Sequence, residues 1–238
     1  MKTKRMAFNR KKWLAVMAFQ LAVTSAVAMD FNLIGDTLIM SGPVLGDDVA
    51  HFKDQVATNR VKLVLLHNSP GGDLWNGQEL ARRIREAGLD TAVSGRCESA
   101  CGLVFLGGVN RYYSDGSPLA KTMIGLHGAH NKDTKQAMPQ LGARMAYLIR
   151  EMTEKKFPDD LLDRTVYPKD PSDFTYVFHP ARFKADGNLR GVMECNRQAD
   201  TTFKCKMVEG LDAISVGATT SSEVLRLNEE VRTIVARP

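Results

Sequence analysis

Ser99 and His127 are the residues whose types and spacing suggest chemistry. Ser99 stands just before the apolar run Leu103–Leu106, and His127 ends another apolar stretch 28 residues later. A serine hydroxyl attacks an acyl carbon when an imidazole removes its proton. At a helix start, free backbone N–H groups and the positive helix end also stabilise an oxyanion. The pattern indicates acyl transfer, although capping the helix is the commoner role of a serine in this position.

Two further features bear on that chemistry. Gly71 and Gly72 follow an apolar stretch, and their lack of side chains lets backbone N–H groups approach a substrate closely. Downstream, Asp170 and Asp173 are carboxylates that could orient the His127 ring. Spacing alone does not choose between the two aspartates.

The elements that must position these residues alternate along the chain. Strands are predicted over 31–34, 37–40, 61–66, 89–94, 111–113 and 122–127, and helices over 47–58, 75–87, 139–156, 159–166 and 221–236. A hairpin is predicted over 189–208. Strand–helix alternation favours right-handed crossovers and a parallel sheet, in which ligands bind beyond the carboxyl ends of the strands. Gly71, Ser99 and His127 each follow a predicted strand, so we expect them at one edge of the sheet.

The first 28 residues have the pattern of a secretory signal peptide. Six basic residues and no acidic ones precede an apolar segment, which ends in Ala26-Val27-Ala28. Cleavage is expected between Ala28 and Met29, which predicts a periplasmic or secreted protein. An uncleaved anchor is the alternative, but the apolar segment of 16 residues is shorter than the roughly 20 that a membrane span needs.

The charge of the chain depends on that segment. The full chain has a formal net charge of +5, whereas residues 29–238 hold 26 basic and 27 acidic residues, a net charge of −1. The basic excess therefore belongs to the export signal and gives no reason to expect a nucleic-acid partner. We expect one main domain over 29–185 and a small C-terminal appendage over 186–238.

All the cysteines lie in the exported part: Cys97, Cys101, Cys195 and Cys205. An even number in an oxidising compartment predicts disulfides, and proximity favours Cys97–Cys101 and Cys195–Cys205 among three possible connectivities. The first pair is plausible if Cys97 lies in the turn before the helix. The cysteine spacings, without supporting histidines, do not favour a zinc site, and His127 with His130 lacks a suitable third ligand. No metal is expected.

Together, the stretch Asn68-Ser69-Pro70-Gly71-Gly72, Ser99 at a helix start and His127 after the next strand resemble the proteolytic subunit of the Clp protease and its crotonase-fold relatives. The resemblance covers residues 30–185. The form Cys-Glu-Ser-Ala-Cys behind a signal peptide is most similar to the exported branch of that superfamily.

The resemblance implies a ClpP/crotonase-like α/β fold of βαβ units and roles for individual residues. Ser99 would be the nucleophile, His127 the base, and the N–H groups of Gly72 (or Gly71) and Ala100 the oxyanion hole. The Pro-Ser-Asp-Phe stretch favours Asp173 as the third member, whereas Asp170 is closer to the Clp spacing. The resemblance also implies a homo-oligomer, for which the 139–156 helix could form the contact, and no cofactor.

The function expected from these residues is serine hydrolysis of peptide or acyl bonds. Because an exported chain has no ATP, no ATPase partner is expected, and the substrate would be a short peptide or an unfolded protein segment. The competing hypothesis is a catalytically inactive scaffold that binds an extended peptide beside Gly71-Gly72. An acyl-CoA activity of the crotonase type is disfavoured, because export removes that substrate.

Overall fold

A computed structural model describes residues 28–131, 133–183, 191–200 and 202–236 of the chain. The predicted signal peptide lies outside these residues except for Ala28. Within the described part, no helix combines the length and the apolar character that crossing a membrane requires.

The N-terminal half alternates as predicted. The elements are β1 (Asp30–Ile34), β2 (Thr37–Ser41), α1 (Asp48–Thr58), β3 (Leu63–Ser69), α2 (Leu74–Glu86), β4 (Asp90–Glu98) and α3 (Ala100–Leu106). Gly35 has a φ of +61° and makes the turn of the predicted β1–β2 hairpin. The prediction that the strand before Ser99 ends at residue 94 is wrong, because β4 continues through Glu98. Cys97 consequently lies in the strand and not in the turn before the helix.

The second half departs further from the prediction. It contains β5 (Arg111–Ser114), β6 (Met123–Leu126), α4 (Gly142–Met152), α5 (Asp159–Val166), β7 (Phe174–Val177), β8 (Gly191–Arg197), β9 (Phe203–Asp212), β10 (Val224–Leu225) and α6 (Glu229–Val235), with short 3-10 turns at Leu119–Lys121, Pro139–Leu141 and Pro180–Phe183. Strand β7 inserts into the sheet within the stretch 167–180, where no strand is predicted. The predicted helices over 139–156 and 221–236 are both too long.

The strands form one mixed sheet in the order β1-β2-β3-β4-β6-β7-β8-β9, with β5 pairing β4 and β10 pairing β5. Strands β2, β3, β4 and β6 run parallel, and the strands from β6 to β9 pair antiparallel. The predicted C-terminal appendage therefore shares this sheet with the main domain. Its hairpin β8–β9 is joined by the disulfide Cys195–Cys205.

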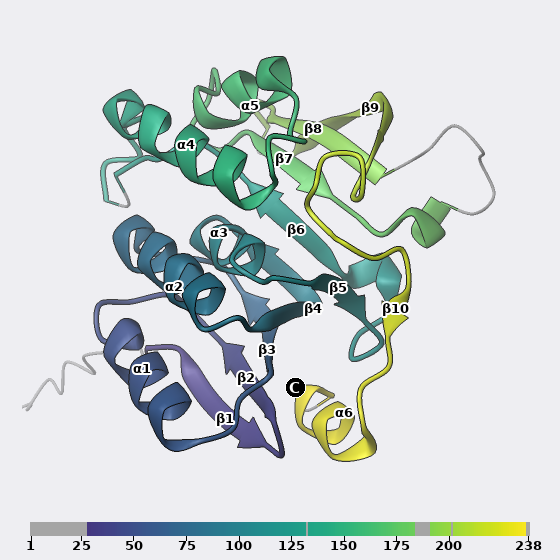
Figure 1. Cartoon of the computed structure of the whole chain (residues 1–238). Helices are drawn as coiled ribbons and strands as arrows, with labels where there is room; N and C mark the ends of the chain where they lie inside the picture. Colours follow the sequence, from purple (N-terminus) through teal and green to yellow (C-terminus); the bar gives the residue numbers. More distant parts are fainter. Residues whose placement is uncertain (1–27, 132, 184–190, 201, 237–238) are drawn as a thin grey trace, which may run out of the picture.

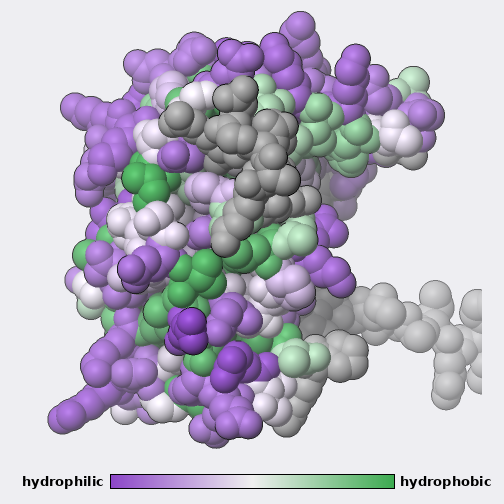
Figure 2. Space-filling view, turned by 90° about the vertical axis from the view of Figure 1, so that its right-hand side faces the viewer, coloured by the Kyte–Doolittle hydropathy of each residue, from purple (hydrophilic) through white to green (hydrophobic). Residues whose placement is uncertain are grey.

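Helices α1 to α5 lie along one side of the sheet, and α6 lies apart from them (Figure 1). The larger core packs around α2, α3 and the inner residues of β3 and β4. A smaller core, in which Ile39, Leu65 and Ala92 contact Val231 and Val235, places α6 on the opposite face. Figure 2 shows the side that carries β10 and α6, where a band of hydrophobic residues runs between hydrophilic ones.

A buried arginine attaches the chain after β9 to this framework. The Arg111 guanidinium donates to the carbonyl oxygens of Gly108, Ala218 and Gly217 at 2.7, 3.1 and 3.0 Å. Burial lowers the pKa of Arg111 to about 10, so the side chain stays charged at neutral pH. Carbonyl dipoles rather than a carboxylate thus compensate its charge.

Candidate active site

Strands β3, β4 and β6 are neighbours and end at the same level of the sheet. Ser69 pairs with Cys97, and Glu98 pairs with Gly125. The glycine turn Gly71-Gly72 follows β3, Ser99 follows β4, and His127 follows β6. The structure therefore brings together the strand ends that carry the predicted nucleophile, base and oxyanion hole.

The backbone at Ser99 is held in an unusual conformation. Ser99 has φ +57° and ψ −125°, which residues with a side chain rarely adopt. Its N–H donates to the Gly125 carbonyl at 2.8 Å, and the buried disulfide Cys97–Cys101 joins the strand before it to the helix after it. Its side chain makes no capping hydrogen bond to α3. Ser99 is half-buried, and its hydroxyl makes no hydrogen bond among the described residues.

The glycine turn packs directly against the junction of β4 and α3 at residues 98–100, called the Ser99 corner from here on. Gly71 has a φ of +79°, and a methyl group on it would overlap the Glu98 carbonyl and lie 2.7 Å from both the Ala100 nitrogen and the Ser99 Cβ. A methyl group on Gly72 would overlap the Val44 carbonyl. Val44 holds the turn in place, since its N–H donates to Gly71 and its carbonyl accepts from Asp73. Only glycine permits this approach.

Two backbone N–H groups at the corner have no acceptor among the described residues: those of Gly72 and Ala100. The Gly71 N–H, in contrast, donates to the Ser69 hydroxyl at 3.2 Å. The Ala100 N–H is the first of α3, where the helix leaves N–H groups unsatisfied. Of the two glycines that the sequence offers for an oxyanion hole, Gly72 therefore has the available donor.

His127 is almost completely buried, with 6% of its surface exposed. Its ring lies 4.4 Å from the Phe174 ring and 5.0 Å from the His130 ring, measured between centroids. Burial, assisted by the nearby His130, lowers the pKa of His127 to about 4. The imidazole is neutral at pH 7, as a general base must be before it accepts a proton. No hydrogen bond joins it to Ser99 among the described contacts.

Neither predicted aspartate binds the His127 ring. Asp173 accepts from the backbone N–H groups of Arg197, at 3.0 Å, and Asp170, at 3.2 Å. The Asp170 carboxylate in turn accepts from the Ser172 N–H at 2.8 Å. In the described residues, the His127 Nδ1 atom is buried and has no partner. The position that a triad carboxylate takes is not filled by either residue.

Sequence reasoning did not find the row of side chains beside the site. The Tyr176 hydroxyl donates to Glu98 at 2.8 Å, and Arg96 donates to the same carboxylate at 2.6 Å. The Phe174 ring is stacked on Tyr176 and tilted by 43° against the His127 ring. Burial and the Glu98 charge raise the pKa of Tyr176. Alternation of aromatic residues at 174, 176 and 178 was the available signal, since such residues occupy one face of a strand.

A second serine–histidine pair lies elsewhere in the sheet. His67 Nδ1 is 3.2 Å from the Ser94 hydroxyl, and its Nε2 is 2.9 Å from the Asn68 side-chain nitrogen. Ser94 is completely buried, and both ring nitrogens of His67 are engaged. This pair cannot meet a substrate as it stands, so its role is to satisfy buried polar groups.

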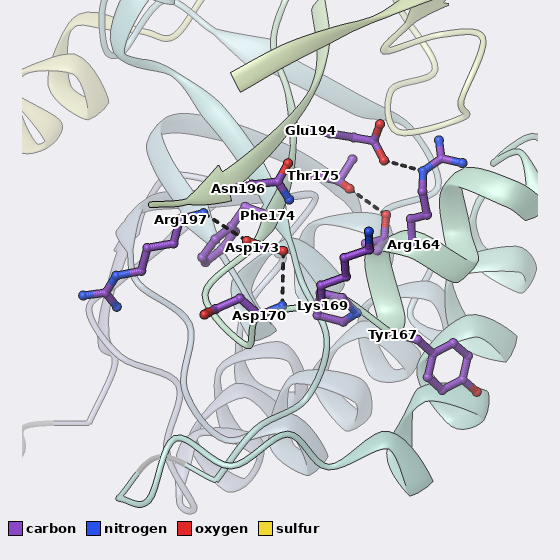
Figure 3. A pocket seen from close by; sticks show the side chains of 12 residues that line it. Arg164, Tyr167, Lys169, Asp170, Asp173, Phe174, Thr175, Glu194, Asn196 and Arg197 are labelled. Carbon is purple, nitrogen blue, oxygen red and sulfur yellow. Dashed lines mark hydrogen bonds and ion pairs between the residues drawn. The ribbon is translucent and has the colours of Figure 1, made fainter. Parts of the chain in front are cut away.

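A cavity of about 490 Å³ lies beside the site, between α5 and the strands β7 and β8 (Figure 3). Phe174 and Asp173 line it, together with Lys169, while Arg164 pairs with Glu194 on one wall. Ser99 and His127 are not among its lining residues. The cavity reaches the candidate site through Phe174, whose ring also contacts His127, and the predicted aspartates Asp170 and Asp173 line it as well.

Comparison with known proteins gives a limited result. No family model matches the chain, and no curated protein matches it. Among solved structures, a mutant of ClpP1 from Listeria monocytogenes is similar at 14% identity and a TM-score of 0.49, with 83% of this chain and 95% of that chain covered. A mutant of the 1510-N membrane-bound stomatin-specific protease is similar at 12% identity and a TM-score of 0.39, with 56% of this chain and 70% of that chain covered. Neither likeness is close enough to assign an activity, so function must be inferred from the site.

Proposed function

We propose that this chain is a serine hydrolase with a ClpP/crotonase-like fold that cleaves peptide or acyl bonds without ATP. The observation that carries the proposal is the Ser99 corner. Ser99 has an uncommitted hydroxyl on a constrained backbone, and the N–H groups of Gly72 and Ala100 have no acceptor among the described residues. Strain at a single residue that the surroundings hold in place is typical of functional sites.

In the proposed reaction, the Ser99 oxygen attacks the acyl carbon while its proton moves to the neutral His127 ring. The N–H groups of Gly72 and Ala100 bind the oxyanion. His127 then returns the proton to the leaving group, and water releases the acyl group from Ser99 by the reverse sequence. Loss of one oxyanion donor in such sites costs about 3 kcal/mol of transition-state stabilisation.

Labelling with a fluorophosphonate probe tests the proposal. The probe should form a covalent adduct with the disulfide-intact protein, detected by intact mass and mapped to Ser99 by peptide mass spectrometry. Ser99→Ala should abolish the adduct. Ser94→Ala is the matched control, because Ser94 also lies next to a histidine but is buried. Absence of labelling in a folded sample with both disulfides would contradict the proposal.

The second candidate function is a peptide-binding protein without catalysis. It is favoured by one observation: in the described structure, Ser99 and His127 are not hydrogen bonded and no carboxylate contacts His127. This candidate predicts that unfolded peptides bind, measured by fluorescence anisotropy, while the probe does not react. Retained peptide binding in Ser99→Ala would fit both candidates, so the labelling result decides between them.

Export and self-association are part of the proposal. The N-terminal basic and apolar segments support cleavage after Ala28, which N-terminal sequencing of the exported protein would test.

Tyr147 on α4 is 62% exposed, and Trp75 on α2, stacked under the Arg144 guanidinium, is 48% exposed. Exposed aromatic residues are enriched at protein interfaces. Light scattering of wild type and Tyr147→Ser would test α4 as a contact between copies.

A further inference from the structure

His127 and His130 carry matching unsatisfied atoms. The Nδ1 atoms of both rings are buried, and neither has a hydrogen-bond partner among the described residues. A neutral imidazole has one nitrogen that donates and one that accepts. An N–H on one ring and a lone pair on the other would therefore satisfy both atoms. Buried polar atoms without partners call for such an explanation.

The two rings are neighbours, although no hydrogen bond joins them in the described structure. Their centroids lie 5.0 Å apart with the planes tilted by 39°, which is about the separation expected for two imidazoles joined by an N–H···N bond of ordinary length. The backbone also fixes His130, because His130 pairs with Ala137 in a short bridge and Met138 donates to Ala129. In free enzymes, catalytic hydrogen bonds are often long and tighten only with substrate bound.

The two aspartates are not available for this role. Both oxygens of Asp173 accept backbone N–H groups, as the dashed lines in Figure 3 show. These bonds connect the turn before β7 to the end of β8. Releasing Asp173 toward His127 would leave buried or partly buried N–H groups without acceptors.

We propose that His130 is the positioning residue of the site, accepting a hydrogen bond from His127 Nδ1–H where a Ser-His-Asp site uses a carboxylate. This inference rests on the proposed function. The bond keeps the lone pair of His127 on Nε2, where it accepts the Ser99 proton. His130 keeps its own proton on Nε2 throughout, so it orients the base and supports the imidazolium without exchanging a proton.

The pH dependence distinguishes this role from simple packing. The groups that face or adjoin His127 are His130 on its own loop, Phe174 on β7 with Asp173 beside it, the backbone of Gly128 and Pro171, and Glu98 with Tyr176 beyond Phe174. Burial is the main cause of the lowered pKa of His127; proximity to His130 lowers it further, and the backbone of Gly128 and Pro171 raises it. Because a hydrogen-bond acceptor on Nδ1–H favours the imidazolium, replacing His130 should lower the pKa on the acid side of the kcat/KM profile, whereas loss of electrostatic repulsion alone would raise it.

The experiment compares His130→Ala, His130→Gln and Asp173→Asn, with the exposed His51→Ala as control, using p-nitrophenyl acetate as the substrate. His130→Ala should lower kcat about 100-fold with KM little changed and should shift the acid limb to lower pH. His130→Gln, which retains an acceptor, should recover part of kcat, and Asp173→Asn should stay within about threefold of wild type. A larger loss of kcat in Asp173→Asn than in His130→Ala would overturn the proposal.

Nitrogen-15 NMR of the histidine rings gives a readout that does not require activity. His127 should carry its proton on Nδ1 in the wild type and shift toward the Nε2 tautomer in His130→Ala, with His51→Ala unchanged. A wild-type His127 in the Nε2–H form would overturn the inference. If the probe fails to label Ser99 while the tautomer shift is observed, the hydrolase proposal fails and the His127–His130 interaction stands.

Discussion

The two halves of the candidate site are built differently. The Ser99 corner is fixed from several directions: a disulfide, a hydrogen bond to Gly125 and the backbone of Gly71 all constrain it. The His127 side is held by aromatic packing, and its Nδ1 atom has no partner among the described residues. The proposed nucleophile, Ser99, is therefore held by the backbone, whereas the proposed base, His127, depends on side chains around it. Mutations should affect the two halves in different ways.

The largest expected effect is at Gly71. Gly71→Ala should reduce the free energy of unfolding by about 4 kcal/mol, because it adds both an overlap with the Glu98 carbonyl and a side chain at a φ of +79°. Gly35→Ala is the matched control. Gly35 has a φ of +61° but no atom within 4 Å of the added methyl group, so a loss of about 1 kcal/mol is expected. Urea unfolding of both variants measures the difference, and equal losses would show that the corner is not tightly packed.

The next effect concerns the His127 side and depends on pH. The pKa of His127 is about 4 in the folded protein and about 6.5 when unfolded. Between these values the unfolded chain binds more protons, so stability rises with pH. The contribution of the neutral His127 ring to the free energy of unfolding is complete above pH 6.5 and is lost as the pH falls through 4. The total effect is about 3 kcal/mol. The measurement is the free energy of unfolding from pH 3.5 to 8 in wild type and His127→Gln.

Subtracting the two curves isolates His127. His67, whose pKa is also lowered by burial, and Asp48, whose pKa is raised by burial, contribute to both proteins and cancel. The difference should rise by about 3 kcal/mol across the interval and level off above pH 6.5. Parallel curves would mean that the His127 ring is accessible to water and not tightly enclosed.

The same contrast explains what the sequence could predict. The β1–β2 hairpin, the bounds of α5 and the order of elements up to α3 follow from turn residues and hydrophobic periodicity. The extension of β4 could not be predicted, because Arg96 and Glu98 are polar and the buried Glu98 carboxylate accepts from Tyr176, which lies 78 residues away. Strand β7 was missed because its four residues lie among prolines and its pairing with β6 is tertiary.

The site divides along the same line. Ser99, Gly71 and Gly72 stand beside strand ends that local patterns reveal, so their meeting could be predicted. The proposed partner of His127 could not be predicted, since Asp173 is engaged by Arg197 on another strand and His130 gives no distinctive local signal. Local sequence patterns predict where strands end and hence which residues meet there, whereas the orientation of a side chain depends on distant residues.

The two disulfides provide a further comparison, with an expected effect on stability smaller than that of His127. Cys97 and Cys101 are buried, whereas Cys205 is exposed on the hairpin. Mild reduction should therefore open Cys195–Cys205 first, as mapped by alkylation and mass spectrometry. Replacing Cys195 and Cys205 by alanine should cost about 2 kcal/mol of stability and leave probe labelling intact. Replacing Cys97 and Cys101 should also slow labelling. Equal labelling in both double variants would show that the Cys97–Cys101 disulfide is not needed to hold Ser99 in its conformation.

The smallest effect is a gain in stability at Ser99. Its positive φ costs a residue with a side chain about 1–3 kcal/mol, and glycine avoids that cost while losing more entropy on folding. Ser99→Gly should therefore be about 1 kcal/mol more stable than Ser99→Ala, although glycine usually destabilises a position that precedes a helix interior. Thermal and urea unfolding of the two variants measure the difference. Ser99→Ala removes the hydroxyl and keeps the strain, so the comparison isolates backbone conformation from chemistry. If Ser99→Ala proves the more stable variant, the backbone at Ser99 is not strained. The argument that strain prepares Ser99 as a nucleophile would then fail.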